Sequence, residues 1–270
     1  MNMEKEEIWR LVFVLFLGQL VSFFLAVASF TSSLIAELGT DAPLTQSFFT
    51  YLSLSLVYGA AFLYRRQKLL VAWYWYFVLA FVDVQGNYLG GTKPIIGDIL
   101  VIAGTFCYAF SNVSEEYCVK KKDRVELLTM LGVFGVLVSA CEISIIERKD
   151  LESVKWSATM ISLFVGFAAS AFLFYTVVPF VLKMSGATLF NLSLLTSDMW
   201  AVVIRIFFYH QQVDWLYYLA FGLVAIGLII YSVHDNKKAN GTTNEDESSS
   251  LQYERLAEES SATYNGILAA

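Results

Sequence analysis

Residues 11–35 read LVFVLFLGQLVSFFLAVASFTSSLI, a stretch without a single charged side chain. About twenty apolar residues in a helix are enough to cross the hydrocarbon core of a bilayer. The whole chain agrees with this local pattern, since its 270 residues are 57% hydrophobic and 16% charged, with a mean hydropathy of +0.59. A soluble chain would carry roughly a quarter charged residues. The sequence therefore predicts a membrane protein and excludes a cytosolic enzyme.

Seven more apolar stretches follow when the chain is divided at its charge clusters and turn residues. Short joints separate them, and each is long enough to be read as a transmembrane helix. The predicted fold class is an all-α membrane protein, a polytopic bundle of about eight helices in a lipid bilayer. The predicted spans are residues 11–35, 46–64, 71–89, 96–117, 127–146, 158–181, 186–208 and 214–233.

The start of the chain also imitates a secretory signal peptide. Lys5 and Arg10 precede the apolar run, and residues 26–28 (AVA) resemble the small-residue site at which such peptides are cleaved. The apolar run continues beyond that point to Ile35, which favours a retained membrane span.

The distribution of lysine and arginine predicts the orientation, because positively charged loops stay on the cytoplasmic side. With the N-terminus inside, the inner loops hold twelve such residues and the outer loops four. We therefore expect both termini in the cytosol, with residues 1–10 before the first span and residues 234–270 after the last. The inner residues are Lys5, Arg10, Arg65, Arg66, Lys68, Lys120, Lys121, Lys122, Arg124, Lys183, Lys237 and Lys238, and the outer ones are Lys93, Arg148, Lys149 and Lys155.

Residues 234–270 are rich in Asn, Gly, Thr, Glu, Asp and Ser. Such a composition cannot bury enough apolar surface to fold, so it predicts a disordered acidic tail. Within it, Tyr253 and Leu256 have the Tyr-x-x-apolar spacing of a cytosolic sorting signal, although tetrapeptides of this form also occur by chance. No basic stripe indicates a nucleic-acid partner.

The seventh span carries three polar residues seven positions apart, Asn191, Asp198 and Arg205. In one continuous helix this spacing places them on one face. Charged groups inside a membrane are costly and usually face a cavity or a partner, so we interpret these three as candidates for one wall of a substrate cavity. On this interpretation Asp198→Asn and Asn191→Ala would abolish uptake. A structural ion pair for Asp198, or snorkelling of Arg205, is the alternative.

The third span offers the opposite wall, Asp83 and Asn87, which lie one helical turn apart. The alternative is that Asp83 is solvated near the outer surface, because Gly90 and Gly91 follow almost at once. Asn112, in the fourth span, is a further candidate that contacts either a neighbouring helix or a ligand.

A proline and three glutamates at or near the ends of predicted spans also need an interpretation. Pro179 is a candidate hinge in the sixth span, or the approach to a helix end. Glu115 and Glu116 end the fourth span near Lys120, which favours an interfacial ion pair, and Glu142 is expected to be solvated.

The sequence predicts neither a metal nor a cofactor. The cysteines Cys107, Cys118 and Cys141 lack the spacing of metal ligands and are interpreted as small buried hydrophobic residues. No phosphate-binding loop, HExxH or GxSxG motif is present in any loop, so an enzyme is not expected.

Three stretches resemble the F-type members of solute carrier family 35, in the drug/metabolite transporter superfamily with the EamA-like fold. They are residues 80–89 (AFVDVQGNYL), 97–104 (GDILVIAG) and 183–200 (KMSGATLFNLSLLTSDMW). The resemblance covers residues 8 to 233. It implies a ten-helix transporter of two inverted five-helix repeats, with a substrate cavity between them and alternating access.

Eight spans are two fewer than the resemblance implies. The two helices would be missing at residues 90–95, a short outer linker, which makes 11–89 an incomplete three-helix repeat and 96–233 a complete one. Two functions follow from the resemblance. One is transport of a small organic metabolite, with nucleotide sugars as one candidate class, across an endomembrane of the Golgi or vacuolar kind or the plasma membrane. The other is a non-transporting shortened isoform that associates with full-length relatives or is degraded.

Overall fold

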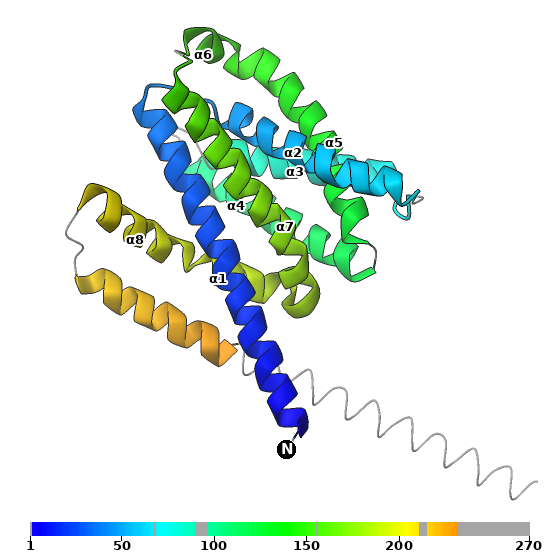
Figure 1. Cartoon of the computed structure of the whole chain (residues 1–270), viewed down its shortest axis with the longest axis vertical. Coiled ribbons are helices and arrows are strands. Elements are labelled where there is room, and N and C mark those ends of the chain that lie inside the picture. Colours follow the sequence, from blue (N-terminus) through cyan, green and yellow to red (C-terminus); the bar gives the residue numbers. More distant parts are fainter. Residues whose placement is uncertain are drawn as a thin grey trace, which may run out of the picture. The chain divides into compact units, whose positions relative to one another are not determined.

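The computed structural model describes residues 2–66, 69–89, 97–121, 123–154, 156–210 and 215–231, and every regular element within them is helical (Figure 1). The predicted all-α fold class is confirmed. Met1–Gly222 form one compact unit, which is described here by itself. Its elements are α1 (Asn2–Glu37), α2 (Pro43–Tyr64), α3 (Trp73–Leu89), α4 (Gly97–Lys121), α5 (Arg124–Glu142), the π-helix η1 (Ile143–Glu147), α6 (Arg148–Ser153), α7 (Ala158–Leu194) and α8 (Ser197–Tyr209).

Four stretches are long and apolar enough to cross a membrane on length and composition alone: Ile8–Glu37, Pro43–Tyr64, Arg124–Glu152 and Ala158–Leu194. The predicted spans 71–89, 96–117 and 214–233 each coincide with one helix that is shorter or less apolar, the last of them over Trp215–Tyr231. The chain is therefore a multi-pass membrane protein with a helical bundle. The predicted linker 90–95 and tail 234–270, with Tyr253 and Leu256, lie outside the described residues.

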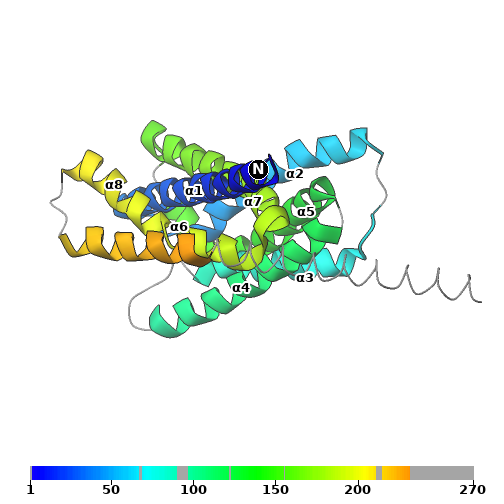
Figure 2. The same cartoon turned by 90° about the horizontal axis from the view of Figure 1, so that it is seen from below.

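Two helix pairs make the most extensive contacts, α1 with α7 and α2 with α5. Figure 1 shows α1 running beside α7, and Figure 2 shows the same bundle from below. Val21 of α1 packs on Val178 and Phe190 of α7. A larger apolar cluster joins α2, α3 and α5 around the fully buried Leu54 and Leu131.

The approach of α2 to α5 depends on two glycines of α5. A Cβ on Gly132 would lie 2.5 Å from the backbone nitrogen of Ser55, and one on Gly135 would lie 2.5 Å from the ring of Tyr51. Small residues allow helices in membranes to approach this closely. The glycines therefore fix the distance between α2 and α5, and with it the position of Tyr51.

Buried carboxylates from one helix stabilise the start of another. Glu147, only 2% exposed, accepts hydrogen bonds from the backbone N–H groups of Leu44 (2.6 Å) and Thr45 (2.8 Å) in the first turn of α2. Glu126 of α5 accepts from the backbone N–H groups of Leu70 (2.8 Å) and Val71 (3.2 Å), just before α3. The first N–H groups of a helix have no partner within the helix, and a negative charge there also favours the helix dipole.

Replacing Glu147 with alanine should therefore destabilise the fold by about 2–4 kcal/mol, since buried donors at the start of α2 would lose their acceptor. We expect a clear drop in the temperature at which the detergent-solubilised protein loses its monodisperse peak in fluorescence-detected size-exclusion chromatography. Glu152→Ala is the control, because Glu152 pairs with Arg148 on an exposed surface and such pairs contribute little. Equal thermal stability of the two variants would contradict the prediction.

The predicted seventh span, 186–208, is not one continuous helix. Gly186 has a non-helical backbone (φ 79°, ψ 171°), and the chain turns again at Leu195 and Thr196 between α7 and α8. Ser22 of α1 donates a hydrogen bond (2.6 Å) to the backbone carbonyl of Ser193, which at this helix end also accepts the backbone N–H (3.0 Å) and the hydroxyl (2.7 Å) of Thr196. The interruption is thus bonded to α1.

Candidate functional site

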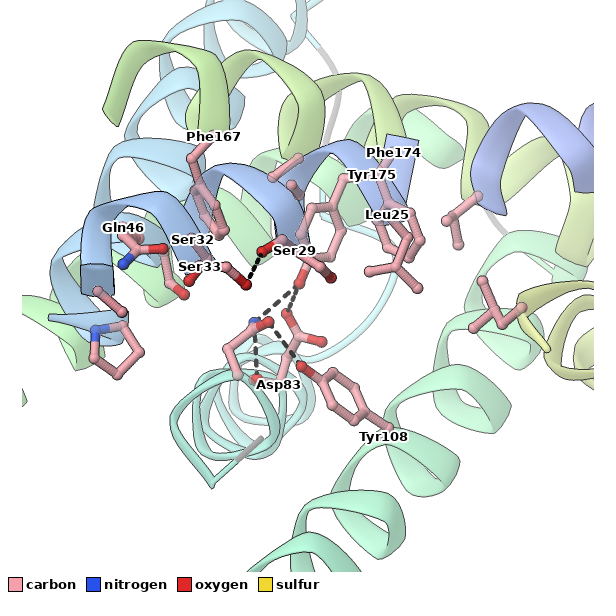
Figure 3. A pocket seen from close by; sticks show the side chains of 18 of the residues that line it. Leu25, Ser29, Ser32, Ser33, Gln46, Asp83, Tyr108, Phe167, Phe174 and Tyr175 are labelled. Atoms are coloured by element: carbon pink, nitrogen blue, oxygen red, sulfur yellow. Dashed lines mark hydrogen bonds between the residues drawn. The ribbon is translucent and has the colours of Figure 1, made fainter. Parts of the chain in front are cut away.

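A cavity of about 550 Å³ lies among α1, α2, α3, α4 and α7. We call it the Asp83 cavity, after the buried carboxylate on its wall (Figure 3). A cavity of this volume is in the range that holds a small organic molecule. It is lined by Leu25, Ala28, Ser29, Ser32, Ser33, Ala36, Thr40, Asp41, Pro43, Gln46, Ser47, Asp83, Asn87, Tyr108, Asn112, Glu115, Phe167, Ala171, Phe174, Tyr175, Val178 and Leu194.

Asp83 lies at the centre of a hydrogen-bond network between four helices. Its Oδ2 accepts the hydroxyl groups of Tyr51 of α2 (2.8 Å) and Tyr175 of α7 (2.6 Å). Its Oδ1 accepts the hydroxyl of Ser111 of α4 (3.1 Å). Three hydroxyl donors stabilise this carboxylate away from water, where it would otherwise be costly. Asp83 is 3% exposed, so the predicted alternative of a solvated surface residue is wrong.

Asn87 extends the network by one turn of α3. Its Nδ2 donates to the hydroxyl oxygens of Tyr51 (2.8 Å) and Tyr175 (3.2 Å), and its Oδ1 accepts from the hydroxyl of Tyr108 (2.9 Å). The ring of Tyr108 lies against Gly86, where a Cβ would be 3.1 Å from it. Asn87 therefore ties α3 to α2, α4 and α7 on the cavity wall.

Two further polar side chains on the wall have few partners. Glu115, 2% exposed, has the Ser111 hydroxyl 3.5 Å from its Oε1. Gln46 is 3% exposed, and its Oε1 has no hydrogen-bond partner among the described residues. Buried polar atoms are normally paired in proteins, so both groups remain available to a bound molecule.

The structure brings some of the predicted site residues together and separates others. Asp83, Asn87 and Asn112 line the Asp83 cavity, and Asn112 Nδ2 donates to Oδ1 of Asn191 (2.7 Å). Asp198 and Arg205 are exposed on α8 and do not line it. The reason is the turn at residues 195–196, because a seven-residue spacing places side chains on one face only in an unbroken helix.

The structure places a break in helical backbone geometry at Gly186 and not at Pro179, the predicted hinge. Pro179 is buried inside the continuous part of α7, seven residues earlier. At Gly186 the second part of α7 begins, and Glu116 of α4 accepts a hydrogen bond from the backbone N–H of Ala187 (2.7 Å). Glu116 also forms the predicted ion pair with Lys120 (2.5 Å). Its neighbour Glu115 instead lines the cavity.

Other sequence expectations need correction. Glu142 is not simply solvated, because Gln85 of α3 donates a hydrogen bond to its carboxylate and the residue is half-buried. Of the cysteines, only Cys118 is buried, whereas Cys107 is half-buried and Cys141 is exposed.

The sequence does not identify three residues of the site as functional candidates: Tyr51, Tyr175 and Gln46. Tyrosine and glutamine inside an apolar run are common packing residues, and only their convergence on Asp83 and the cavity distinguishes them.

Residues 7–90 and 89–233 match the family described as solute carrier family 35, in two blocks that meet at positions 89–90. The chain is similar to solute carrier family 35 member F2 of Mus musculus, with 28% identity over 296 positions that cover 83% of the chain and 79% of the relative. It is 38% identical to the protein of that name from Xenopus tropicalis over 147 residues, covering 54% of the chain and 38% of the relative. It is 36% identical over 156 residues to an uncharacterized solute carrier family 35 member of Schizosaccharomyces pombe, covering 58% of the chain and 31% of the relative.

The alignment with the mouse protein spans 296 positions, which is more than the number of residues that this chain contributes to it. Since 83% of 270 residues is about 224, about 72 of the 296 aligned positions have no residue here, a length that holds two membrane helices of about twenty residues each with their loops.

Proposed function

Because the chain belongs to solute carrier family 35 as an F-type member, and is thereby a solute transporter in general terms, we propose that it carries a small organic solute through the Asp83 cavity. The observation that supports this most directly is the set of buried polar side chains on the wall of a 550 Å³ cavity inside an apolar bundle. Polar groups are expensive within a membrane, and they commonly mark the path of a solute.

Alternating access is the mechanism we propose. The cavity is lined from both predicted repeats, by α1, α2 and α3 of residues 11–89 and by α4 and α7 of residues 96–233. Transporters of this design bind solute between repeats that rock against each other. In this mechanism the hydrogen bonds that the hydroxyls of Tyr175 and Ser111 in the second repeat donate to Asp83 in the first would join the two repeats in one state and break in the other.

The proposal is tested by partly filling the cavity. Proteoliposomes are incubated with a small-molecule extract of yeast cells, and the solutes that accumulate are identified by mass spectrometry. Ser29→Trp should reduce accumulation at least tenfold, because the indole would occupy space on the cavity wall. Ala169→Trp is the matched control on α7, since Ala169 lines a separate apolar groove between α2 and α7.

Accumulation by the control but not by Ser29→Trp supports transport through the Asp83 cavity. Equal accumulation by both variants places the route elsewhere, and no accumulation by the wild-type protein overturns the proposal.

We also propose the membrane orientation that the charge distribution predicts, with both termini in the cytosol. Twelve lysines and arginines in the inner loops against four in the outer ones support it. An endomembrane of the Golgi or vacuolar kind, or the plasma membrane, is the proposed location.

A second candidate function is supported by the 72 aligned positions that this chain lacks. We propose that two helices are missing near residue 89, and that a chain without them associates with full-length relatives instead of transporting by itself. Co-purification with an intact relative, together with absence of uptake by the chain alone, would favour this function. Robust uptake by the purified chain would exclude it.

A further inference from the structure

We infer that the solute of the Asp83 cavity is an organic cation, a protonated amine carried on an apolar or aromatic body, and not a phosphate-bearing anion. This inference rests on the proposed function, because it names the solute class of the same site. It replaces the nucleotide-sugar interpretation of the sequence, which would need cationic side chains around a diphosphate.

The charges on the cavity wall are all of one sign. Asp83 and Glu115 are buried, and Asp41 lies at an exposed position where α1 leads into α2. None of the described lining residues is a lysine, arginine or histidine. A cavity with this charge attracts cations and repels phosphates, and the effect is strong where water is scarce.

The two buried carboxylates compete for one hydroxyl proton. Ser111 Oγ lies 3.1 Å from Asp83 Oδ1 and 3.5 Å from Glu115 Oε1, and a serine hydroxyl donates only one hydrogen bond. Asp83 has the shorter contact and also receives two tyrosine hydroxyls. Glu115 is therefore the carboxylate left without a committed donor, and a buried carboxylate in that position calls for a proton or a cationic partner.

Gln46 provides an independent observation at another point of the same wall. Its Oε1 is a buried acceptor without a partner among the described residues. Ser32 and Ser33 line the cavity with it (Figure 3). An unpaired acceptor is satisfied by a ligand that donates hydrogen bonds, which an ammonium group does and a phosphate dianion does not.

Aromatic rings complete the wall. Phe167, Phe174, Tyr175 and Tyr108 all line the cavity, and Figure 3 shows Tyr175 and Tyr108 next to Asp83. Aromatic faces attract organic cations and also pack against an apolar body. Acids, an unpaired acceptor and aromatic rings therefore favour the same class of ligand.

The test uses three probes of one shape that differ in a single group: tyramine (a protonated amine), tyrosol (a neutral alcohol) and 4-hydroxyphenylacetate (an anion). Binding is measured as the shift in unfolding temperature of the purified full chain in detergent, at millimolar probe concentrations. We expect tyramine to raise the unfolding temperature, tyrosol to have a smaller effect and the anion none. N,N,N-trimethyltyramine keeps the positive charge but has no N–H to donate to Gln46, so its effect should be smaller than that of tyramine and larger than that of the anion.

Two substitutions locate the binding. Glu115→Gln keeps the size of the side chain and should weaken tyramine binding about tenfold, because a buried carboxylate partner of the cation is lost. Gln46→Met removes the unpaired acceptor and should also weaken it. Glu152→Gln, on the exposed surface of α6, should bind as the wild-type protein does.

The outcomes separate this inference from the proposed function. Stabilisation by the anion and not by tyramine overturns the inference, as does no response to tyramine, or a response to Na⁺ alone. Uptake of anionic solutes from the yeast extract would overturn it while leaving the proposed transport intact. Tyramine binding without any uptake would support the inference and count against transport.

Discussion

Replacing Asp83 with asparagine is expected to lower uptake by about 30-fold or more without reducing the amount of folded protein. Loss of one buried charged partner typically costs about 2–5 kcal/mol, and 1.4 kcal/mol corresponds to tenfold. Asparagine has nearly the same volume, its amide oxygen can still accept from Tyr51 and Tyr175, and its NH2 group can donate to the hydroxyl oxygen of Ser111, so the side chain stays bonded in place. The effect should therefore fall on the solute and on switching between states.

The measurement is uptake by proteoliposomes of the solutes that wild-type protein accumulates, normalised to protein that elutes as a sharp size-exclusion peak. Asp198→Asn is the matched control, because it is the same chemical change at an exposed carboxylate outside the cavity. We expect it to leave uptake within about twofold of the wild type. Loss of uptake in Asp198→Asn with retention in Asp83→Asn would show that the solute path follows α8 and not the Asp83 cavity.

The second large effect is expected at the contact of α2 with α5. Gly132→Ala should destabilise the bundle by about 1–3 kcal/mol, because a new methyl group would press on the backbone of Ser55 and cannot be relieved by rotating a side chain. The two helices would have to separate, and Tyr51, packed against Gly135, would move away from Asp83. We therefore expect both a lower unfolding temperature and reduced uptake.

Gly59→Ala is the control for this substitution. Gly59 lies on α2, and a Cβ there would meet only Thr129 at 3.9 Å, an ordinary contact. Alanine is a better helix former than glycine, so this variant should be as stable as the wild type or slightly more stable. If Gly132→Ala proved as stable as Gly59→Ala, the close approach of α2 to α5 would not be what positions Tyr51.

The residues behind these two expected effects can be recognised in the sequence to different degrees. Asp83 and Asn87 could be identified from the sequence, because a carboxylate and an amide one turn apart in an apolar helix are unusual. Their position on the wall of the cavity could not, since the same residues near a helix end are compatible with a solvated surface. Asp198 has an equally conspicuous position in the sequence, yet it lies outside the cavity wall.

The difference arises from a local break in the helix. A run of apolar residues predicts the length of a helix from composition, whereas the turn at Leu195 and Thr196 depends on partners supplied by α1. The Thr196 hydroxyl lies 3.1 Å from Gln19 Nε2, which donates to it, and Ser22 donates to the carbonyl of Ser193. These partners are more than 170 residues away along the chain, and sequence periodicity contains no information about them.

The sequence by itself determined that this chain is an all-helical membrane protein of solute carrier family 35, and where most of its helices lie. Hydrophobic length and the placement of charge are local properties, and the bilayer acts on them directly. Only the tertiary structure decided which polar residues share a cavity, that its buried charges are acidic, and that Gln46 is left with an unpaired acceptor. These facts depend on which helix faces meet, and that is fixed by packing between segments distant in the sequence, such as Gly132 against Ser55.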